Sequence, residues 1–161
     1  LKGVMRAAAV TLLGKDDRKP SRDHWAVREV FGSSWAPSPW SWSSARLDNR
    51  EWTFDHRHRV AIDPGSHSAR KDHIVLGEQA WACATRFEIS RVGVLDAAAL
   101  TEADHVLILR CAAAGVHGLG SWRRRGLGWV GITPDDGKIS AAEVRRLAQI
   151  RCSPSPAGAT R

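Results

Sequence analysis

Residues 52–62 alternate between two kinds of side chain and read Trp52-Thr53-Phe54-Asp55-His56-Arg57-His58-Arg59-Val60-Ala61-Ile62. The even-numbered positions carry aromatic, histidine and aliphatic side chains, whereas the odd-numbered ones carry mostly polar and cationic side chains. A period of two is typical of a β-strand, whose successive side chains point to opposite faces. The stretch therefore predicts a long strand with a cationic outer face, which ends at the turn residues Asp63-Pro64-Gly65.

A second extended region follows this turn. Residues 64–73 are polar and predict a mobile connection, and residues 74–78 resume an extended pattern. From Trp81 to Ile89 apolar or small residues again alternate with polar ones. Residues 52–90 therefore predict a β-ribbon with a basic excursion at its far end.

Helical patterns lie on the N-terminal side of the ribbon. Residues 1–13 place apolar side chains at helical spacing and stop at Gly14, and residues 24–31 form a shorter pattern that stops at Gly32. The connection over residues 33–44 is rich in Ser, Pro and Trp and predicts no regular structure, because proline is unsuited to a central strand.

The C-terminal part predicts two further helices. Thr101 with Asp104 resembles a capping box that begins a buried helix ending at Gly115, and Ser140 with Glu143 begins another that ends near residue 150. Between them, residues 127–133 predict a strand, and residues 151–161 predict a disordered tail.

The predicted order is helix, strand, strand, helix, strand. It predicts an α+β domain over residues 1–150 that has the ferredoxin-like plan without its first strand. Within this domain, residues 115–128 form a C-terminal glycine-rich loop.

Composition limits the classes of function. The chain has 161 residues, with 24 Lys and Arg against 17 Asp and Glu, so its net charge is +7. Such a balance favours nucleic acid, an anionic membrane surface, or solubility alone. No apolar run reaches the roughly 18 residues of a membrane span, and no signal peptide is visible. Three cysteines, an odd number, favour free thiols in a reducing compartment, so we expect a cytoplasmic protein.

The segment from Gly115 to Ile132 carries the strongest functional signal. Glycines lie on both sides of three consecutive arginines, and a tryptophan precedes the arginines. Glycine lets the backbone approach a polyanion, arginine donates paired hydrogen bonds to phosphate, and an indole can stack on an unpaired base. The alternative is an ordinary glycine-rich turn with a solvated arginine run. The candidate phosphate-binding residues are Gly118, Gly120, Trp122, Arg123, Arg124, Arg125, Gly126 and Gly128.

Two further basic sites are candidates. Lys2 and Arg6 lie four residues apart on the first predicted helix, where a merely solvated face is the simpler interpretation. The ribbon carries a longer cationic set, and a basic hairpin can lie along a nucleic-acid strand or can simply face solvent. Its candidates are Arg57, Arg59, Arg70 and Lys71, with His56, His58 and His73 beside them.

Signals for catalysis or metal binding are weak. His56 and His58 could share a strand face, but the chain has no CxxC or HxxxH pair. It also lacks the G-x-S-x-G nucleophile elbow of α/β-hydrolases, and its paired aspartates lie in predicted loops. We therefore assign no catalytic residue and no cofactor, with Mg²⁺ as the metal to expect if the chain cuts RNA.

Several pieces together resemble the RAMP superfamily (repeat-associated mysterious proteins), and the ribbon resembles most the backbone subunits of type III CRISPR effector complexes. The resemblance covers about residues 1–133. It is carried by Leu1-Lys2-Gly3-Val4-Met5-Arg6, Phe31-Gly32-Ser33, Arg59-Val60-Ala61-Ile62-Asp63, Ser68-Ala69, Leu76, Glu78, Thr85-Arg86-Phe87-Glu88-Ile89 and the glycine-rich run from Gly118 to Val130.

The resemblance implies a subunit that repeats along a guide RNA (crRNA) as a filament with other RAMP subunits and pairs the guide with target RNA. It implies a fold like that of the RNA recognition motif, with the ribbon as a long thumb, at about residues 56–79, that displaces a base at intervals. It also implies phosphate contacts by Lys2, Gly3 and Arg6 and a guide-lining loop from Gly118 to Gly128. The family's leading strand is missing, so we expect another segment or chain to fill the gap.

Three functions are therefore open. The first is a guide-binding, non-catalytic subunit, because the aspartate that the family uses for cleavage belongs upstream of Leu1, and Ser43-Ser44-Ala45-Arg46 replaces a motif that is often acidic. The second is a metal-dependent endoribonuclease of the same superfamily. The third is a basic RNA-binding module outside CRISPR.

Overall fold

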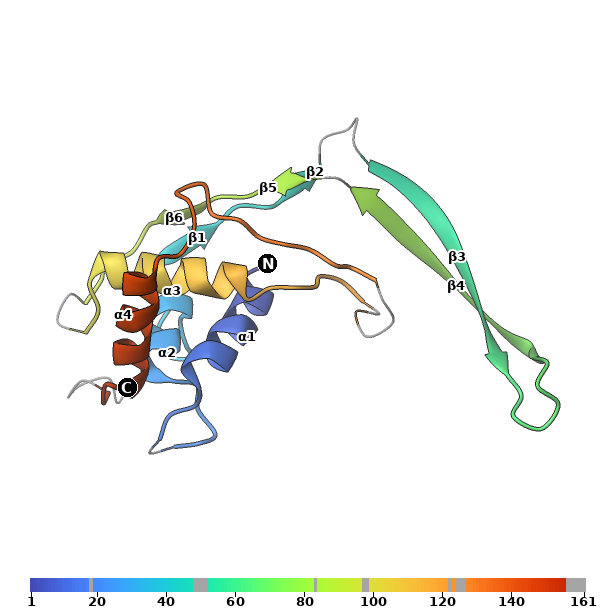
Figure 1. Ribbon diagram of the computed structural model, residues 1–161, viewed down its shortest axis with the longest axis horizontal. Helices are drawn as coiled ribbons and strands as arrows, with labels where there is room; N and C mark the ends of the chain where they lie inside the picture. The colour runs from blue at the N-terminus through green and yellow to red at the C-terminus, as the bar shows by residue number, and fades with distance from the viewer. Residues whose placement is uncertain are drawn as a thin grey trace. The chain divides into compact units, whose positions relative to one another are not determined.

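The structure, a computed structural model, describes residues 1–17, 19–47, 52–82, 84–96, 99–121, 123 and 127–155. The chain divides into two compact units: a helical unit, residues 1–41 with 90–161, and a hairpin unit, residues 42–89. Over the described residues the protein is mixed α+β, with four helices and small antiparallel sheets of two strands each (Figure 1). The coarse α+β prediction is confirmed.

The helical unit contains all four helices. Their bounds are α1 Lys2–Leu13, α2 Trp25–Phe31, α3 Glu102–Ala114 and α4 Ala141–Cys152. The first two end where predicted, at Gly14 with φ 87° and Gly32 with φ 82°, in a region that favours glycine. Helix α1 packs against α2, α3 and α4, so these predicted helices share one core.

Both predicted capping boxes are present. At α3 the Thr101 hydroxyl accepts from the Asp104 backbone N–H at 3.2 Å, and the Asp104 carboxylate accepts from the Thr101 N–H at 3.2 Å. At α4 the Ser140 hydroxyl accepts from the Glu143 N–H at 3.2 Å, and the Glu143 carboxylate accepts from the Ser140 N–H at 2.7 Å. These bonds satisfy backbone donors that a helix start leaves unpaired.

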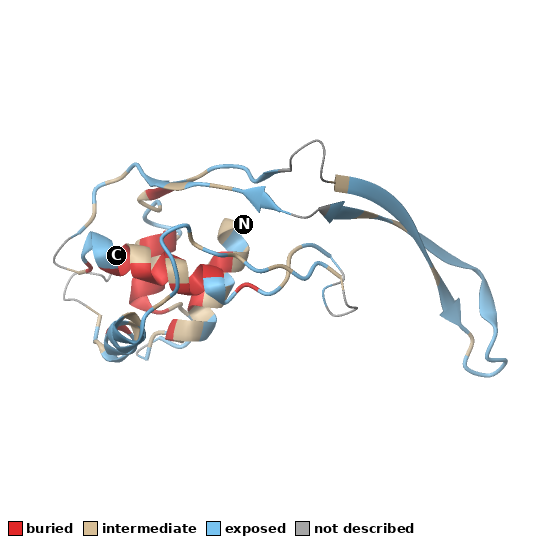
Figure 2. Cartoon of the chain, turned by 45° about the horizontal axis from the view of Figure 1, so that its top comes forward, coloured by how far each residue is buried: buried red, intermediate tan, exposed pale blue. Residues whose placement is uncertain are grey.

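The core of the helical unit is apolar and is built mainly by α1, α2 and α3 (Figure 2). Its largest fully buried side chains include Phe31, Met5 and Ile108. His105 is buried with them; its Nδ1 accepts a 3.1 Å hydrogen bond from the indole N–H of Trp40. Burial lowers the pKa of His105, so the neutral ring is the form that suits this core.

Ion pairs connect α3 to α4. The guanidinium of Arg146 donates to both carboxylate oxygens of Asp104, at 2.7 and 2.9 Å. This pair, together with the Thr101 cap, lowers the pKa of Asp104 to about 2 although burial opposes the shift. Arg110 on α3 pairs with Glu143 and with Asp136. Asp104 therefore caps its own helix and also holds α4.

Four short strands form two pairs. Strand β1 (Trp40–Trp42) pairs with β6 (Ile89–Arg91), and β2 (Arg46–Leu47) pairs antiparallel with β5 (Thr85–Arg86). The prediction that residues 33–44 lack regular structure is wrong at β1, because Trp40 is buried and bonded to His105. The predicted strand over residues 81–89 is interrupted and contributes to β4, β5 and β6.

The hairpin unit is dominated by β3 (Trp52–Ile62) and β4 (Ala69–Ala82), which pair antiparallel as predicted. Their turn is held by Asp63, whose Oδ1 accepts from the backbone N–H groups of Gly65 and Ser66 at 3.0 and 2.8 Å. These bonds lower the pKa of Asp63. The predicted mobile excursion is wrong for residues 69–73, which belong to β4, so the connection is shorter than expected.

Two C-terminal predictions also need correction. Residues 127–133 form no strand; their only ladder contact among the described residues is an isolated antiparallel bridge from Trp129 to Gly118. Residues 151 and 152 belong to α4 and not to a tail, and residues 156–161 lie outside the described part of the chain. No helix in the described ranges is both long enough and apolar enough to cross a membrane.

Candidate functional site

The glycine-rich segment folds back on itself. The backbone N–H of Leu119 donates to the carbonyl of Gly128 at 2.8 Å, and the N–H of Val130 donates to the carbonyl of His117 at 3.4 Å. With the bridge between Gly118 and Trp129, these bonds join two described arms, residues 115–121 and 127–130. We call these arms, together with Arg123, the glycine hairpin. It follows the end of α3 directly, so the helix fixes where the hairpin begins.

Glycine is required at Gly128 for two reasons. Its φ is 70°, in the left-handed region, and a Cβ built there would lie 1.9 Å from the carbonyl oxygen of Leu119. Any side chain would break the closest approach of the two arms. Gly120, with φ 84°, has the same backbone requirement but open space around it.

Gly118 has a different role, because it makes room for an arginine. A Cβ there would lie 3.2 Å from Cδ and 3.5 Å from Cγ of Arg123. The aliphatic stem of Arg123 therefore lies across the bare backbone of Gly118, which supports the guanidinium without a hydrogen bond. The structure thus brings together three of the predicted site residues: Gly118, Arg123 and Gly128.

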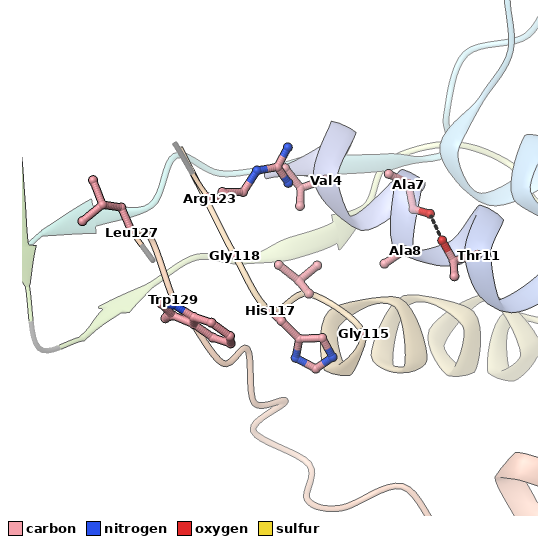
Figure 3. A pocket seen from close by; sticks show the side chains of 11 residues that line it. Val4, Ala7, Ala8, Thr11, Gly115, His117, Gly118, Arg123, Leu127 and Trp129 are labelled. Carbon is pink, nitrogen blue, oxygen red and sulfur yellow. Dashed lines mark hydrogen bonds between the residues drawn. The ribbon is translucent and has the colours of Figure 1, made fainter. Parts of the chain in front are cut away.

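A groove of about 520 Å³ lies between α1 and the glycine hairpin (Figure 3). On the α1 side its wall consists of small or short side chains at helical spacing. On the hairpin side Figure 3 shows Arg123 extending toward α1. Among the described residues that line the groove none is Asp or Glu, so its potential is set by Arg123 and the polar edge of His117. The lining residues are Val4, Ala7, Ala8, Thr11, Gly115, Val116, His117, Gly118, Arg123, Leu127 and Trp129.

Trp129 was not among the sequence candidates, yet it is the most exposed aromatic group of this groove. Its side chain is 77% exposed, whereas Trp25 and Trp40 in the same unit are buried. A large exposed indole beside a groove is the kind of surface that binds flat ligands. The sequence did offer a signal for this residue, because Trp129 lies among glycines after the arginine run. The strand predicted over residues 127–133 explained the tryptophan as a strand residue instead.

Lys2, Gly3 and Arg6 do not join this groove. Arg6 donates to the carboxylate of Asp23 at 3.0 and 3.1 Å and to the carbonyl of Gly32 at 3.0 Å. Lys15 pairs with the same carboxylate at 2.7 Å, and these two cations lower the pKa of Asp23. Arg6 therefore joins α1 to the segments that flank α2, which is a structural role that sequence alone did not reveal.

The cationic residues of the ribbon lie in the hairpin unit. Arg57 and Arg59 occupy the same face of β3, and Arg57 donates to the side-chain oxygen of Gln79 at 3.4 Å. Arg70 and Lys71 lie near the start of β4 and are exposed. The remaining candidates, Trp122, Arg124, Arg125 and Gly126, lie outside the described residues.

Histidine, cysteine and acidic side chains are scattered over the described residues. Within the described ranges, no three His, Cys, Asp or Glu side chains gather in a way that could hold a metal ion. The perturbed groups that the structure does place, such as Asp104 and His105, serve caps and core contacts. At the groove the structure combines one cation, an exposed indole and a wall of small side chains.

No protein-family model matches the chain, and no curated protein matches it.

Proposed function

We propose that the chain is an RNA-binding backbone subunit of a type III CRISPR ribonucleoprotein that grips the phosphate backbone of a guide RNA. The observation that carries the proposal is the glycine hairpin, where Gly118 and Gly128 bring Arg123 beside a groove whose described lining residues include no Asp or Glu. A cationic, glycine-built surface suits a ribose-phosphate chain because the backbone can approach it closely and arginine can pair with phosphate oxygens.

The proposal includes a ferredoxin-like plan for the helical unit. Helix α1, the paired strands β1 and β6, and α3 follow one another in the order that the plan requires, and α1 packs against α3. Strands from another segment or chain would complete the sheet.

The β3–β4 hairpin has the role of the thumb in this proposal. Each face carries exposed apolar side chains: Val75 lies opposite Arg59 on the face that also carries Arg57, and Phe54 and Leu76 lie on the other face. Cationic groups can follow phosphates, and exposed apolar groups can pack on bases where guide and target strands are kept apart. Sequence information would lie in guide–target pairing, so the protein itself needs no base-specific contacts.

The test is equilibrium binding of a fluorescein-labelled single-stranded RNA to the full chain over a series of salt concentrations. Arg123→Ala removes one phosphate contact and should lower the slope of log affinity against log salt by about 0.7. Arg145→Ala is the matched control, because it removes the same charge from an exposed position on α4. If both variants lowered the salt slope equally, the effect would come from the net charge of the chain and not from a contact at Arg123, which would contradict the proposal.

A second pair of variants tests the hairpin itself. Gly128→Ala should weaken RNA binding, because its Cβ would force the two arms apart, whereas Gly131→Ala meets no atom within 4 Å and should bind normally. Neither glycine belongs to the apolar core, so far-ultraviolet circular dichroism should show folded helices in both variants. Mg²⁺-dependent cleavage of the RNA by the chain would favour the endoribonuclease alternative.

A further inference from the structure

We infer that the groove between α1 and the glycine hairpin accepts an unpaired nucleobase of the bound RNA, stacked on Trp129. The inference rests on the proposed function, since it names which part of the RNA the groove takes. Phosphate binding alone explains Arg123 but leaves the exposed indole and the groove beside it without a role.

The groove has room for such a group. Its volume, about 520 Å³, falls within the roughly 300–1,000 Å³ typical of small-molecule sites and leaves space for a base with its ribose. The α1 wall has no long side chain: Ala7 and Ala8 leave it open, and the Thr11 hydroxyl donates to the carbonyl of Ala7 at 3.1 Å (Figure 3). That wall is therefore flat and largely apolar, which suits the face of a ring.

The charge of the groove selects the class of ligand. None of its described lining residues is acidic, and Arg123 adds a cation at the hairpin side. An apolar site with one cation and an exposed indole fits a nucleotide, whose base is flat and whose phosphate is anionic. An extended apolar peptide would use the wall of α1 but would leave Arg123 unmatched, so a nucleotide uses more of the observed chemistry.

The experiment compares two probes of equal length: a single-stranded RNA and a fully abasic ribose-phosphate oligomer. Trp129→Ala should weaken binding of the RNA by about 5- to 100-fold, the usual effect of losing one stacked base, and should leave the abasic oligomer unaffected. Trp35→Ala is the matched control, because Trp35 is 80% exposed in the same unit but lies outside the groove. Trp129→Phe should restore most of the loss, since a smaller ring still stacks.

A second variant closes the groove without touching the hairpin. Ala7 is exposed on α1 and lines the groove, so Ala7→Leu fills the space and retains helix propensity. It should reduce RNA affinity as Trp129→Ala does and again spare the abasic oligomer. Unchanged RNA binding by both variants would overturn the inference. If Arg123→Ala still weakened RNA binding in that case, the proposed function would stand without the inference. If the unmodified chain binds neither probe, both proposals fail.

Discussion

The helical unit and the β3–β4 hairpin differ in how far they bury their apolar side chains. Every buried apolar side chain among the described residues belongs to the helical unit, while the hairpin leaves large apolar groups such as Phe54, Ile74 and Leu76 more than half exposed. An isolated two-stranded hairpin is marginally stable in water. The comparison teaches that the helical unit holds the buried core of the described chain, whereas the hairpin leaves its large apolar side chains open to solvent.

The largest expected effect contrasts two isoleucines. Ile108 on α3 is 1% exposed and Ile74 on β4 is 65% exposed. Ile108→Ala should lower the free energy of unfolding by about 2–5 kcal/mol, because it removes buried methyl groups and leaves a cavity. Ile74→Ala should change it by less than about 0.5 kcal/mol. Urea unfolding followed by far-ultraviolet circular dichroism measures both, and similar losses would erase the distinction between the two regions.

A smaller effect is expected at the junction of α3 and α4. The pKa of Asp104 is lowered from 3.8 to about 2, so the unfolded chain takes up this proton first as the pH falls. The stabilisation is complete above pH 4 and is lost between about pH 4 and pH 2; it amounts to about 1–2 kcal/mol, since Arg146 is half exposed.

Asp104→Asn tests this linkage directly, because the amide keeps much of the shape but has no carboxylate to titrate. The variant should be less stable at pH 6, and its stability should vary less than that of the unmodified chain between pH 4 and pH 2. Unfolding midpoints across that range provide the measurement. Parallel pH profiles for the two proteins would show that Asp104 does not supply the acid sensitivity.

The smallest effect concerns the hairpin turn. Asp63→Ala removes the acceptor for Gly65 and Ser66, so amide exchange in β3 and β4 should become faster while the helices keep their protection. Asp63→Asn retains a side-chain oxygen and should keep most of the turn. Loss of protection in α1 or α3 would mean that the two regions do not open independently.

Local signals predicted the helices well. The glycines after α1 and α2 and the two capping boxes are short-range patterns, so Gly14, Gly32, Thr101 and Ser140 could be recognised from neighbouring residues alone. The ribbon was equally accessible, because a period of two repeats along most of β3. The start of β4 at Ala69 was missed, since residues 70–73 are polar on both faces and give no apolar alternation. The interruption of the predicted strand over residues 81–89 was missed as well.

Contacts between residues far apart in the sequence limited how much of the site could be predicted. No local pattern indicates that Arg6 pairs with Asp23, so the sequence analysis treated Arg6 as a phosphate ligand. No local pattern places Trp129 beside α1 either. Strand β1 was missed for the same reason, because its partner strand, β6, lies far along the chain. The composition of the glycine hairpin was informative, but which of its side chains line a groove depends on how close α1 lies.

The most direct test of the central claim is crosslinking of an RNA that carries 4-thiouridine, followed by identification of the attached peptides. The account predicts that crosslinks concentrate on residues 115–130, with Trp129 or His117 among the modified residues, and that Arg123→Ala diminishes them. Crosslinks confined to α4, or spread evenly over exposed cationic residues with the glycine hairpin unmodified, would contradict it.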